Sequence, residues 1–507
     1  MREYLKNLEE QGKLKIVNET MDPRHVQHMI GEANGPVLFK KITGYPEYSM
    51  FGGMFTGREM MAEMLRCSTR NIAQSFEKLI KNSIKPVVVD DAPFKKNRVT
   101  GDAVDLSSIP IPVMHHGDGG PYFSSAIVIA EDPHGELGTN LGMYRLMYRN
   151  RNETGINMTT AGDLRLFYQR ALDKKQPLKI SVAVGVSPTL VFASAYKAPL
   201  GTSEYDVAGG IMGEPVRVVR SETNGLMVPE ETEILLEGEL LPIGWTEMEG
   251  PFAEFAGFQG DGKRNTIFRV DSISYRDNPI YYSLYMPDEN HVMGLATTEQ
   301  LAYSAMRNAG LEVHEVHATP GGCSFWHIVA SIKKRAGEGK NALLAALSVS
   351  GVKLAIVTDS DVDIYNQKEL ERAIAFRVQA DKDVLIVSGA RGKHVDPSLK
   401  SWTYPVGALP TTSKMGIDAT KPDDIPWEKY TLYTCYQEEK AEIVPCSRKE
   451  LKEIIIEKLS HGHVKFTDLM KQLNRYAYRD IMQAWGQLKE EGLLKKEDSK
   501  GNYYVER

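Results

Sequence analysis

The hydrophobic pattern of this chain changes character along its length, and that change constrains the fold more than any other feature. Residues 105–282 carry short runs rich in β-branched side chains, and the runs at 216–219 and 234–240 alternate between apolar and polar positions. Alternation with a period of two is typical of strands that bury one face of an antiparallel sheet. We therefore predict a sheet-rich middle region that closes into a split β-barrel.

Helices and strands are predicted to alternate on both sides of this region. Residues 2–12 and 57–83 show the apolar recurrence of amphipathic helices, with strand-like runs between them. After the barrel, β-α repetition predicts a packed α/β arrangement. The expected elements there are helices at 297–309, 325–335 and 367–379 and strands at 311–317, 352–359 and 383–389.

The end of the chain has a pattern of its own. Beyond residue 445, three short amphipathic helices precede a hairpin turned at residues 499–502, which is a winged-helix-like order of elements. The 507 residues exceed what one ordinary core accommodates. The predicted fold class is mixed α/β (α+β), divided into an N-terminal α/β domain (1–104), a split-barrel domain (105–296), an α/β domain (297–425) and a winged-helix-like appendage (446–507).

Composition narrows the class of protein. A hydrophobic content of 42% and a net charge of −6 are typical of a globular protein and argue against a general nucleic-acid or anionic-membrane surface. No apolar run approaches the roughly 20 residues that span a bilayer, and the N-terminus lacks the apolar core of a secretion signal. The four cysteines (Cys67, Cys323, Cys435 and Cys446) are scattered, which favours reduced thiols in the cytoplasm.

Residues 249–254 (Glu-Gly-Pro-Phe-Ala-Glu) carry the strongest chemical signal. Two carboxylates on either side of a glycine and a proline predict a tight loop that presents both acids toward a common point. With Arg145 nearby, burial and charge pairing shift carboxylate pKa values in opposite directions, which is a usual preparation for proton transfer. The alternative is a pair of solvated loop charges. We interpret Glu254, Glu249 and Arg145 as a catalytic set.

The order of several segments resembles one family. Residues 140–145 (Asn-Leu-Gly-Met-Tyr-Arg), 203–210 (Ser-Glu-Tyr-Asp-Val-Ala-Gly-Gly) and 249–254 together resemble the UbiD-type (de)carboxylases, which use prenylated flavin mononucleotide (prenylated FMN). Residues 389–392 and 413–420 fit the same family, and the resemblance extends over residues 1–425. It implies a flavin-reductase-like split barrel that binds the cofactor and a homo-oligomer, a dimer or hexamer, built through residues 297–425.

The resemblance also implies roles for single residues. Glu254 matches the proton donor or acceptor at the substrate carbon, and Arg145 and Glu249 match the partners that orient and tune it. Lys414 is a candidate for phosphate contact, with a solvated charge or a subunit contact as the alternatives, and His291 is a candidate for substrate contact. The implied cofactor-binding residues are Asn140, Met143, Tyr144, Arg145, Ser194, Ala195 and Lys414.

A divalent metal, Mn²⁺ or Mg²⁺, is implied at the flavin phosphate, with K⁺ beside it. Asn140 and Glu204 match two of the family's metal ligands, and their oxygens suit a hard cation. The third ligand of the family is usually a histidine, but this chain has no histidine between His134 and His291. The nearest alignable residue is Asp163, which is either the third ligand or the N-cap of the helix that follows.

The expected function is reversible decarboxylation or carboxylation of an aromatic, heteroaromatic or α,β-unsaturated acid. Loss of CO₂ from an sp² carbon needs an electron sink, and prenylated FMN, made by a flavin prenyltransferase, is the sink that the resemblance implies. The alternative is a non-catalytic flavin- or effector-binding regulator that uses the winged helix on DNA. The mixed charge of residues 476–491 disfavours nucleic-acid binding. A flavin oxidoreductase is disfavoured because no nicotinamide-binding fingerprint follows a strand.

Overall fold

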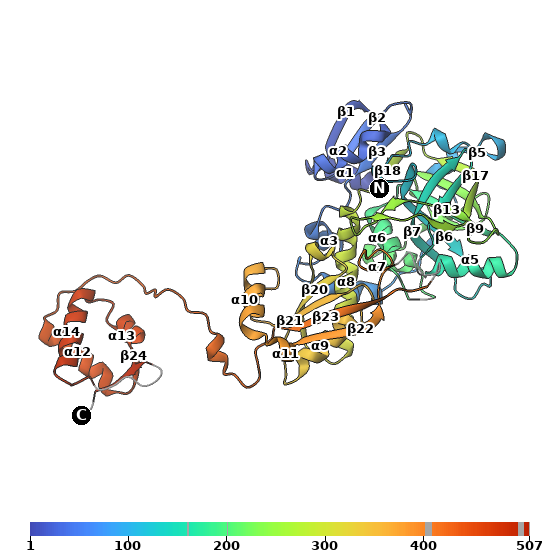
Figure 1. Cartoon of the computed structure of the whole chain (residues 1–507). Helices are drawn as coiled ribbons and strands as arrows, with labels where there is room; N and C mark the ends of the chain where they lie inside the picture. The colour runs from blue at the N-terminus through green and yellow to red at the C-terminus, as the bar shows by residue number, and fades with distance from the viewer. Residues whose placement is uncertain (160–161, 200, 401–407, 495–500, 506–507) are drawn as a thin grey trace. The chain divides into compact units, whose positions relative to one another are not determined.

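The computed structural model describes residues 1–159, 162–199, 201–400, 408–494 and 501–505, and the chain forms two compact units, Met1–Asp424 and Ile425–Arg507. Figure 1 shows three sheet regions in the larger unit, with helix α8 (Asp288–Asn308) between the barrel and the last sheet. Among the described residues, no helix is both long and apolar enough to cross a membrane.

The N-terminal sheet is completed by a strand from much later in the chain. Its order is β1-β2-β3-β18, where β1 (Lys15–Met21) and β2 (Val37–Ile42) are parallel and β3 (Ser49–Gly52) is antiparallel to β2. Strand β18 (Ile280–Tyr282) runs parallel to β3, and Tyr281 and Tyr282 are fully buried there. This pairing ties the start of the chain to the segment that follows the barrel.

Short helices accompany this sheet, and one prediction about them is wrong. Helices α1 (Arg2–Glu10) and α2 (Val26–Ala33) precede α3 (Arg58–Met64) and α4 (Ile72–Lys81). The single helix predicted over 57–83 is therefore two helices. Between them Arg66 has a φ of 53° and serine, threonine and asparagine follow, residues whose short polar side chains compete with helical hydrogen bonds.

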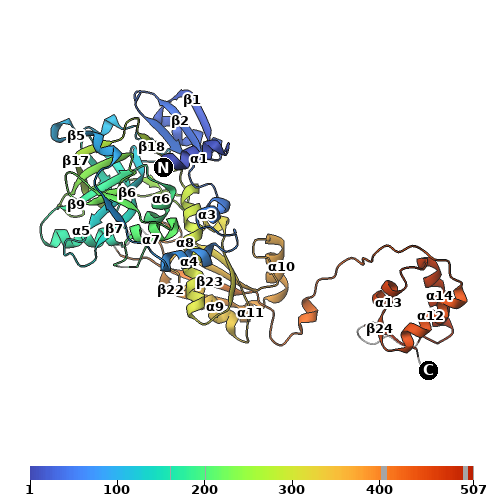
Figure 2. The same cartoon turned by 180° about the vertical axis from the view of Figure 1, so that it is seen from behind.

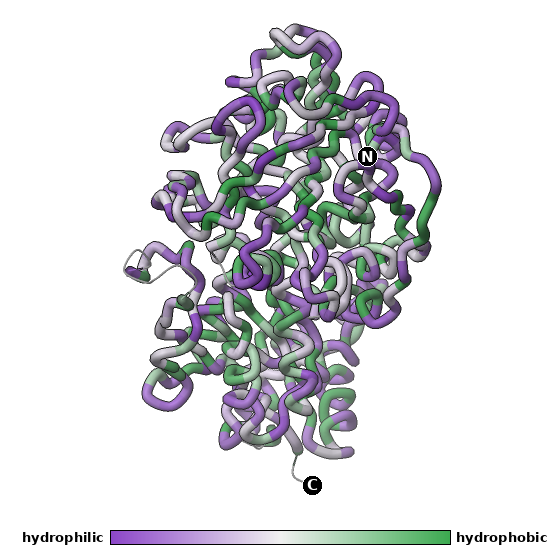
Figure 3. The backbone as a smooth tube through the Cα atoms, turned by 90° about the vertical axis from the view of Figure 1, so that its right-hand side faces the viewer, coloured by the Kyte–Doolittle hydropathy of each residue, from purple (hydrophilic) through white to green (hydrophobic). Residues whose placement is uncertain are grey.

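The predicted barrel is present and closed. Its six strands pair in the order β12-β9-β6-β7-β8-β17, and β17 pairs back onto β12. Figure 3 shows hydrophobic and hydrophilic stretches following one another along the backbone, with many hydrophilic stretches on loops at the periphery. The strands are β6 (Tyr122–Glu131), β7 (Thr139–Asn150), β8 (Glu153–Ile156), β9 (Leu178–Val184), β12 (Ile234–Leu240) and β17 (Ile267–Tyr275), with β5 (Asn97–Thr100) added beside β17.

Helices and hairpins around the barrel carry most of the motif residues. Helices α6 and α7 contact β7, and α5 contacts β6, β7 and β9. The helices are α5 (Asp163–Asp173), α6 (Pro188–Ala195) and α7 (Glu204–Met212). A small sheet joins β4 (Val87–Val89), β10 (Arg217–Arg220) and β11 (Met227–Pro229), and two hairpins pair β13 (Glu247–Glu249) with β16 (Lys263–Asn265) and β14 (Phe252–Ala253) with β15 (Gln259–Gly260).

The last part of the larger unit is a five-stranded sheet in the order β19-β20-β21-β23-β22. Strands β20, β21 and β23 are parallel, both edge strands are antiparallel, and α9 packs on β21 and β23, as the view from behind shows (Figure 2). The elements are β19 (Val313–Ala318), β20 (His327–Ile332), α9 (Glu338–Leu347), β21 (Leu354–Asp359), α10 (Gln367–Arg377), α11 (Ala380–Asp383), β22 (Val384–Arg391) and β23 (Thr411–Asp418).

The helix predicted at 325–335 is wrong, because residues 327–332 form strand β20. Residues 328–332 are all buried, as expected for a central parallel strand covered on both faces. A short continuous apolar run does not distinguish such a strand from a buried helix by periodicity. The predicted helix at 297–309 is present but begins earlier, at Asp288, as part of α8.

The smaller unit has its own core. Helices α12 (Arg448–Ser460), α13 (Phe466–Gln472) and α14 (Tyr478–Glu490) bury Leu451, Leu469 and Trp485 against one another. Strand β24 (Val464–Lys465) pairs with β25 (Asn502–Tyr503), and Leu494 bridges Val505. Residues 499–500 of the predicted turn at 499–502 lie outside the described residues.

Candidate active site

A cavity of about 440 Å³ lies against barrel strand β7 and collects most of the predicted site residues. Its lining comes from β7, the first turns of α5 and α7, the end of α6, the β14 loop and helix α8. Ten of the residues predicted for this site fall into the lining or directly behind it. The predicted residues in the lining are Asn140, Met143, Tyr144, Arg145, Asp163, Ser194, Ala195, Glu204 and Glu254.

Arg145 joins the two motif acids. Its Nε and Nη2 atoms donate to the two oxygens of Glu249, each at 2.9 Å, and its Nη1 donates to Oε1 of Glu254 at 2.9 Å. The side chain of Glu249 is 0% exposed, and that of Glu254 is 12% exposed. Glu249 is thus clamped behind the cavity by both oxygens, whereas Glu254 lines the cavity and has no other side-chain hydrogen bond among the described residues.

The local sequence explains how the two acids converge. Glu249 ends the hairpin strand β13, and Gly250 then adopts a φ of 94°, a conformation that favours glycine. The chain turns there, and Phe252 packs beneath the guanidinium of Arg145, whose Cζ lies 4.6 Å from the ring centre. Glu254 follows immediately and meets Arg145 from the other side of the turn.

Electrostatics keep this arginine charged. Burial by itself lowers the pKa of Arg145, but attraction to Glu254 and Glu249 outweighs burial and raises the pKa above its ordinary value. A permanent cation between two carboxylates fixes the orientation of both. The arrangement suits a proton carrier, Glu254, held by a cation whose charge is balanced by the second acid.

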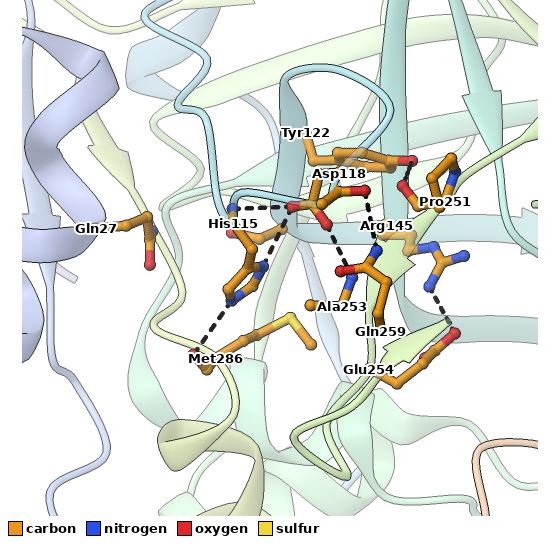
Figure 4. A network of polar contacts seen from close by, with 12 residues as sticks. Gln27, His115, Asp118, Tyr122, Arg145, Pro251, Ala253, Glu254, Gln259 and Met286 are labelled. Carbon is orange, nitrogen blue, oxygen red and sulfur yellow. Dashed lines mark hydrogen bonds and ion pairs between the residues drawn. The ribbon is translucent and has the colours of Figure 1, made fainter. Parts of the chain in front are cut away.

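A polar network holds the loop that carries Glu254 (Figure 4). Oδ1 of Asp118 accepts from the amide of Ala253 at 2.8 Å, and its Oδ2 accepts from the amide of His115 at 3.0 Å and lies 3.2 Å from the same residue's Nδ1. The hydroxyl of Tyr122 donates to the carbonyl of Pro251 at 3.3 Å. These bonds fix the backbone on the N-terminal side of the acid.

A second group of oxygen-bearing side chains lines the same cavity. Asn140 lies near the start of β7, while Asp163 and Glu204 are the first residues of α5 and α7. The backbone amide of Leu141 donates to Glu204 Oε2 at 2.9 Å, and the buried Nδ2 of Asn140 has no partner among the described residues. Two carboxylates, one amide and two helix N-termini would fit a hard cation together with an anion.

Comparison with known proteins identifies the chain. Three family models match it, all of the 3-octaprenyl-4-hydroxybenzoate carboxy-lyase family: the N-terminal domain at 5–80, the Rift-related domain at 85–289 and the C-terminal domain at 291–419. The chain belongs to the UbiD family of carboxy-lyases. The resemblance predicted from its motifs is therefore confirmed.

Named UbiD relatives are decarboxylases. The chain is 30% identical over 449 residues to phenolic acid decarboxylase of Bacillus subtilis, covering 83% of this chain and 92% of the relative. It is 28% identical over 425 residues to anhydromevalonate phosphate decarboxylase of Methanosarcina mazei, covering 83% and 96%. The UbiD-class enzyme HmfF from Pelotomaculum thermopropionicum in complex with FMN has a TM-score of 0.78 and 33% identity, covering 85% of this chain and 96% of HmfF. None of these findings supports the regulator hypothesis.

The structure does not support the predicted phosphate contact of Lys414 or the N-cap alternative for Asp163. Lys414 lies on β23, where its Nζ donates to the carbonyls of Leu347 at 2.6 Å and Val349 at 2.8 Å, and it is absent from the cavity lining. Its ammonium group caps the end of α9 instead of reaching a cofactor. Asp163 is not an N-cap: Gly162 holds that position, without a side-chain capping bond.

His291 and Lys393 show what motif reasoning missed. His291 does not line the cavity, and its Nε2 lies 2.6 Å from the carbonyl of Phe255. Lys393 does line it, although no role was predicted for this residue. Its position directly after the family-like segment 389–392 was the available signal. A lysine in a loop has no periodicity that separates a cavity residue from a solvated one.

The stability of this UbiD chain should depend on pH through the oxygen-bearing group of Asn140, Asp163 and Glu204. Burial raises the pKa of Glu204 to about 7, and the charge of Asp163 adds to the shift. A raised carboxyl pKa stabilises the protein at low pH, and this contribution is lost as the pH rises through about 7. In metal-free protein, we expect the loss of this contribution to lower the melting temperature as the pH rises through about 7. The Glu204→Gln variant should not show this decrease.

A divalent metal bound through Glu204, as the family resemblance predicts, would reverse this trend, because a metal needs the ionised carboxylate. We expect Mn²⁺ to raise the melting temperature at a pH of about 8 and to have little effect at about 5. Thermal unfolding with and without metal measures both effects. Equal stabilisation by Mn²⁺ at both pH values would contradict binding through Glu204.

Proposed function

We propose that this UbiD-family enzyme catalyses the reversible, non-oxidative decarboxylation of an aromatic, heteroaromatic or α,β-unsaturated carboxylic acid with prenylated FMN. The observation that carries the proposal is the bridge from Arg145 to both Glu249 and Glu254 at the edge of one cavity. Phenolic acid and anhydromevalonate phosphate decarboxylases among the relatives support this substrate class.

The proposed cofactor fits the residues present. Prenylated FMN, when bound, supplies the electron sink that loss of CO₂ from an sp² carbon requires. Asn140, Met143, Tyr144, Ser194 and Ala195 line the cavity from two neighbouring elements and are proposed to hold it. Support comes from HmfF, solved in complex with FMN and, as an evolved dimeric form with 30% identity and a TM-score of 0.75, with prenylated FMN.

Glu254 is proposed to deliver the proton to the substrate carbon after CO₂ departs and to remove it in the carboxylating direction. Arg145 holds one carboxylate oxygen of Glu254, so the other remains available to the substrate. Glu249 balances the arginine charge and stops it from drawing Glu254 into a two-oxygen clamp. The side chains of Arg145 and Glu249 are 8% and 0% exposed, so little water competes with the contacts that orient Glu254.

Metal ions are proposed to anchor the flavin phosphate. Mn²⁺ or Mg²⁺ would be held by Asn140, Glu204 and Asp163, with phosphate oxygens completing the shell. The described residues contain no cluster of three or more His, Cys, Asp and Glu side chains suited to a metal, so the proposal rests on two carboxylates and the amide of Asn140 lining one cavity. K⁺ is proposed beside it, on backbone oxygens near Ser194.

Further proposals concern the whole protein. Residues 105–296 are assigned as the cofactor-binding domain between an N-terminal domain (1–104) and an oligomerisation domain (297–425), with a dimer or hexamer as the assembly. Residues 446–507 are proposed to be a winged-helix-like structural appendage that does not bind nucleic acid. The four cysteines are free, in keeping with a cytoplasmic enzyme that receives its cofactor from a flavin prenyltransferase.

A direct assay tests the proposed activity. The protein, produced together with a flavin prenyltransferase, is offered a panel of aryl, heteroaryl and α,β-unsaturated acids, and CO₂ release and deuterium exchange at the reacting carbon are measured. We expect exchange and decarboxylation of at least one acid only when the cofactor is prenylated. Equal activity with unmodified FMN would refute the cofactor assignment.

Loss of metal ligands should remove metal and flavin together. In Glu204→Ala, we expect bound Mn²⁺ and flavin to fall in parallel, because the cation is proposed to bridge protein and phosphate; elemental analysis and absorbance measure both. Asp163→Ala should behave in the same way if this aspartate replaces the family histidine. Unchanged metal content in Asp163→Ala would remove it from the ligand set, and Asp173→Ala at the other end of α5 is the control.

A further inference from the structure

A second, smaller cavity adjoins the proposed proton carrier. It has a volume of about 280 Å³ and shares Asn157, Glu254, Phe255 and Lys393 with the larger cavity. The two cavities therefore meet at Glu254. Within the described part of the chain, Glu254 is also the only carboxylate in the smaller cavity's lining.

The remaining titratable residues of this cavity are basic. Lys263 comes from hairpin strand β16, Arg391 ends β22, and Lys393 and His394 follow Arg391. The cavity thus lies where the hairpin beside the barrel meets the last sheet, within one compact unit. Two lysines, an arginine and a histidine surround a single acid that is already bonded to Arg145.

Within the described part of the chain, the two lysines and the arginine of this cavity lack neutralising partners. Across the described ranges, the side chains of Lys263, Arg391 and Lys393 make no hydrogen bond or ion pair with another residue. The ammonium of Lys393 lies 4.2 Å from the ring centre of Phe325 and 5.5 Å from that of Phe255, contacts that favour a cation but supply no anion.

Burial and the neighbouring positive charge lower the pKa of Lys393. Burial lowers the pKa of Lys393 to about 8, and the charge of Arg391 adds to the shift. Lys393 is still mostly protonated at neutral pH. A half-buried ammonium without a counter-ion is expected to bind an anion that enters the cavity, and the forked guanidinium of Arg391 suits carboxylate or phosphate oxygens.

We propose, on the basis of the proposed function, that Lys393, Arg391 and Lys263 form an anion subsite next to Glu254. The preferred substrate is then an acid that carries a second anionic group, a carboxylate or a phosphate monoester, on the side of the molecule away from the reacting carboxylate. The reacting carbon lies at Glu254 in the larger cavity, and the second anion occupies the smaller one.

Matched acids test the subsite by binding. Benzoate, terephthalate and para-carboxyphenyl phosphate share one ring and differ only in the second anion, and their affinities for the flavin-loaded protein are measured by calorimetry. We expect terephthalate or the phosphate to bind at least about tenfold tighter than benzoate, with the preference weakening at high salt. The stronger of the two shows whether the second group is a carboxylate or a phosphate.

Variants locate the effect. Lys393→Met and Arg391→Gln should each reduce the preference for the dianion, and the double variant should bring it to within about twofold of benzoate. Arg391 is exposed, so Arg391→Gln and Lys263→Gln preserve the test if Lys393→Met does not fold. Lys382→Met on α11, outside both cavities, is the control.

The outcomes separate this subsite from the proposed function. An unchanged dianion preference in the variants overturns the subsite, as does equal affinity of the wild type for benzoate and both dianions. Loss of bound flavin in Lys393→Met would assign this lysine to the cofactor and overturn the subsite too. A dianion preference without decarboxylation of any acid would instead refute the proposed function and leave the subsite standing.

Discussion

Replacing Glu254 with glutamine is expected to abolish turnover and substrate-linked deuterium exchange while the flavin remains bound. The amide keeps the size of the side chain and its hydrogen bond to Arg145, but it cannot carry the proton. Loss of a positioned general acid typically lowers the rate by about 10²- to 10⁴-fold. Single-turnover rates and the flavin absorbance of the purified variant measure both parts of the prediction.

Glu247→Gln is the matched control for this experiment. Glu247 lies on β13 close to Glu249, its side chain is 38% exposed and it pairs with Arg149 outside the cavity. We expect the control to retain wild-type exchange. Wild-type deuterium exchange in Glu254→Gln would remove this residue from the mechanism, whatever happens to the overall rate.

Replacing Arg145 should damage both stability and catalysis. In Arg145→Met, the fully buried carboxylate of Glu249 loses the one cation paired with it among the described residues, and removal of one partner from a buried ion pair costs about 3–5 kcal/mol of unfolding free energy. Glu254 loses its orientation at the same time, so turnover should fall by at least about 10²-fold. Denaturant unfolding and steady-state kinetics measure the two effects.

Two further variants interpret this result. Arg145→Lys retains the charge but cannot make the two-oxygen contact with Glu249, so we expect partial stability and poor activity. Arg217→Met breaks an ion pair with Glu230 whose arginine is 60% exposed, and it should cost about 1 kcal/mol or less. If Arg145→Met loses no more stability than this control, Arg145 does not stabilise the buried carboxylate of Glu249.

The acid pair illustrates how much of the site was readable in advance. Arg145, Glu249 and Glu254 were predicted to act together because their residue types and order match one family, and they do meet in space. The sequence did not predict that the two acids are held differently. Arg145 binds both oxygens of Glu249 behind the cavity, whereas it binds one oxygen of Glu254 at the cavity edge. Only the backbone turn at Gly250 and the packing of Phe252 decide which acid faces the cavity.

The secondary-structure predictions were right where the pattern is local and wrong where packing decides. Barrel strands whose side chains alternate between core and solvent were predicted correctly, because apolar and polar residues alternate in their sequence. Strand β20 was mistaken for a helix, since a strand covered on both faces has no alternation. Strand β18 joining the N-terminal sheet left no local pattern at all.

Local sequence patterns and motif order were therefore enough to predict the family, the mixed α/β class, the barrel strands and the types of residue at the site. Tertiary packing was needed to show that Lys414 caps a helix, that Asp163 lines one cavity with Asn140 and Glu204, and that Lys393 lines the same cavities as Glu254. Periodicity records how neighbouring side chains divide between core and water. A site built from distant strands depends on which strands pack together, and long-range burial sets that choice.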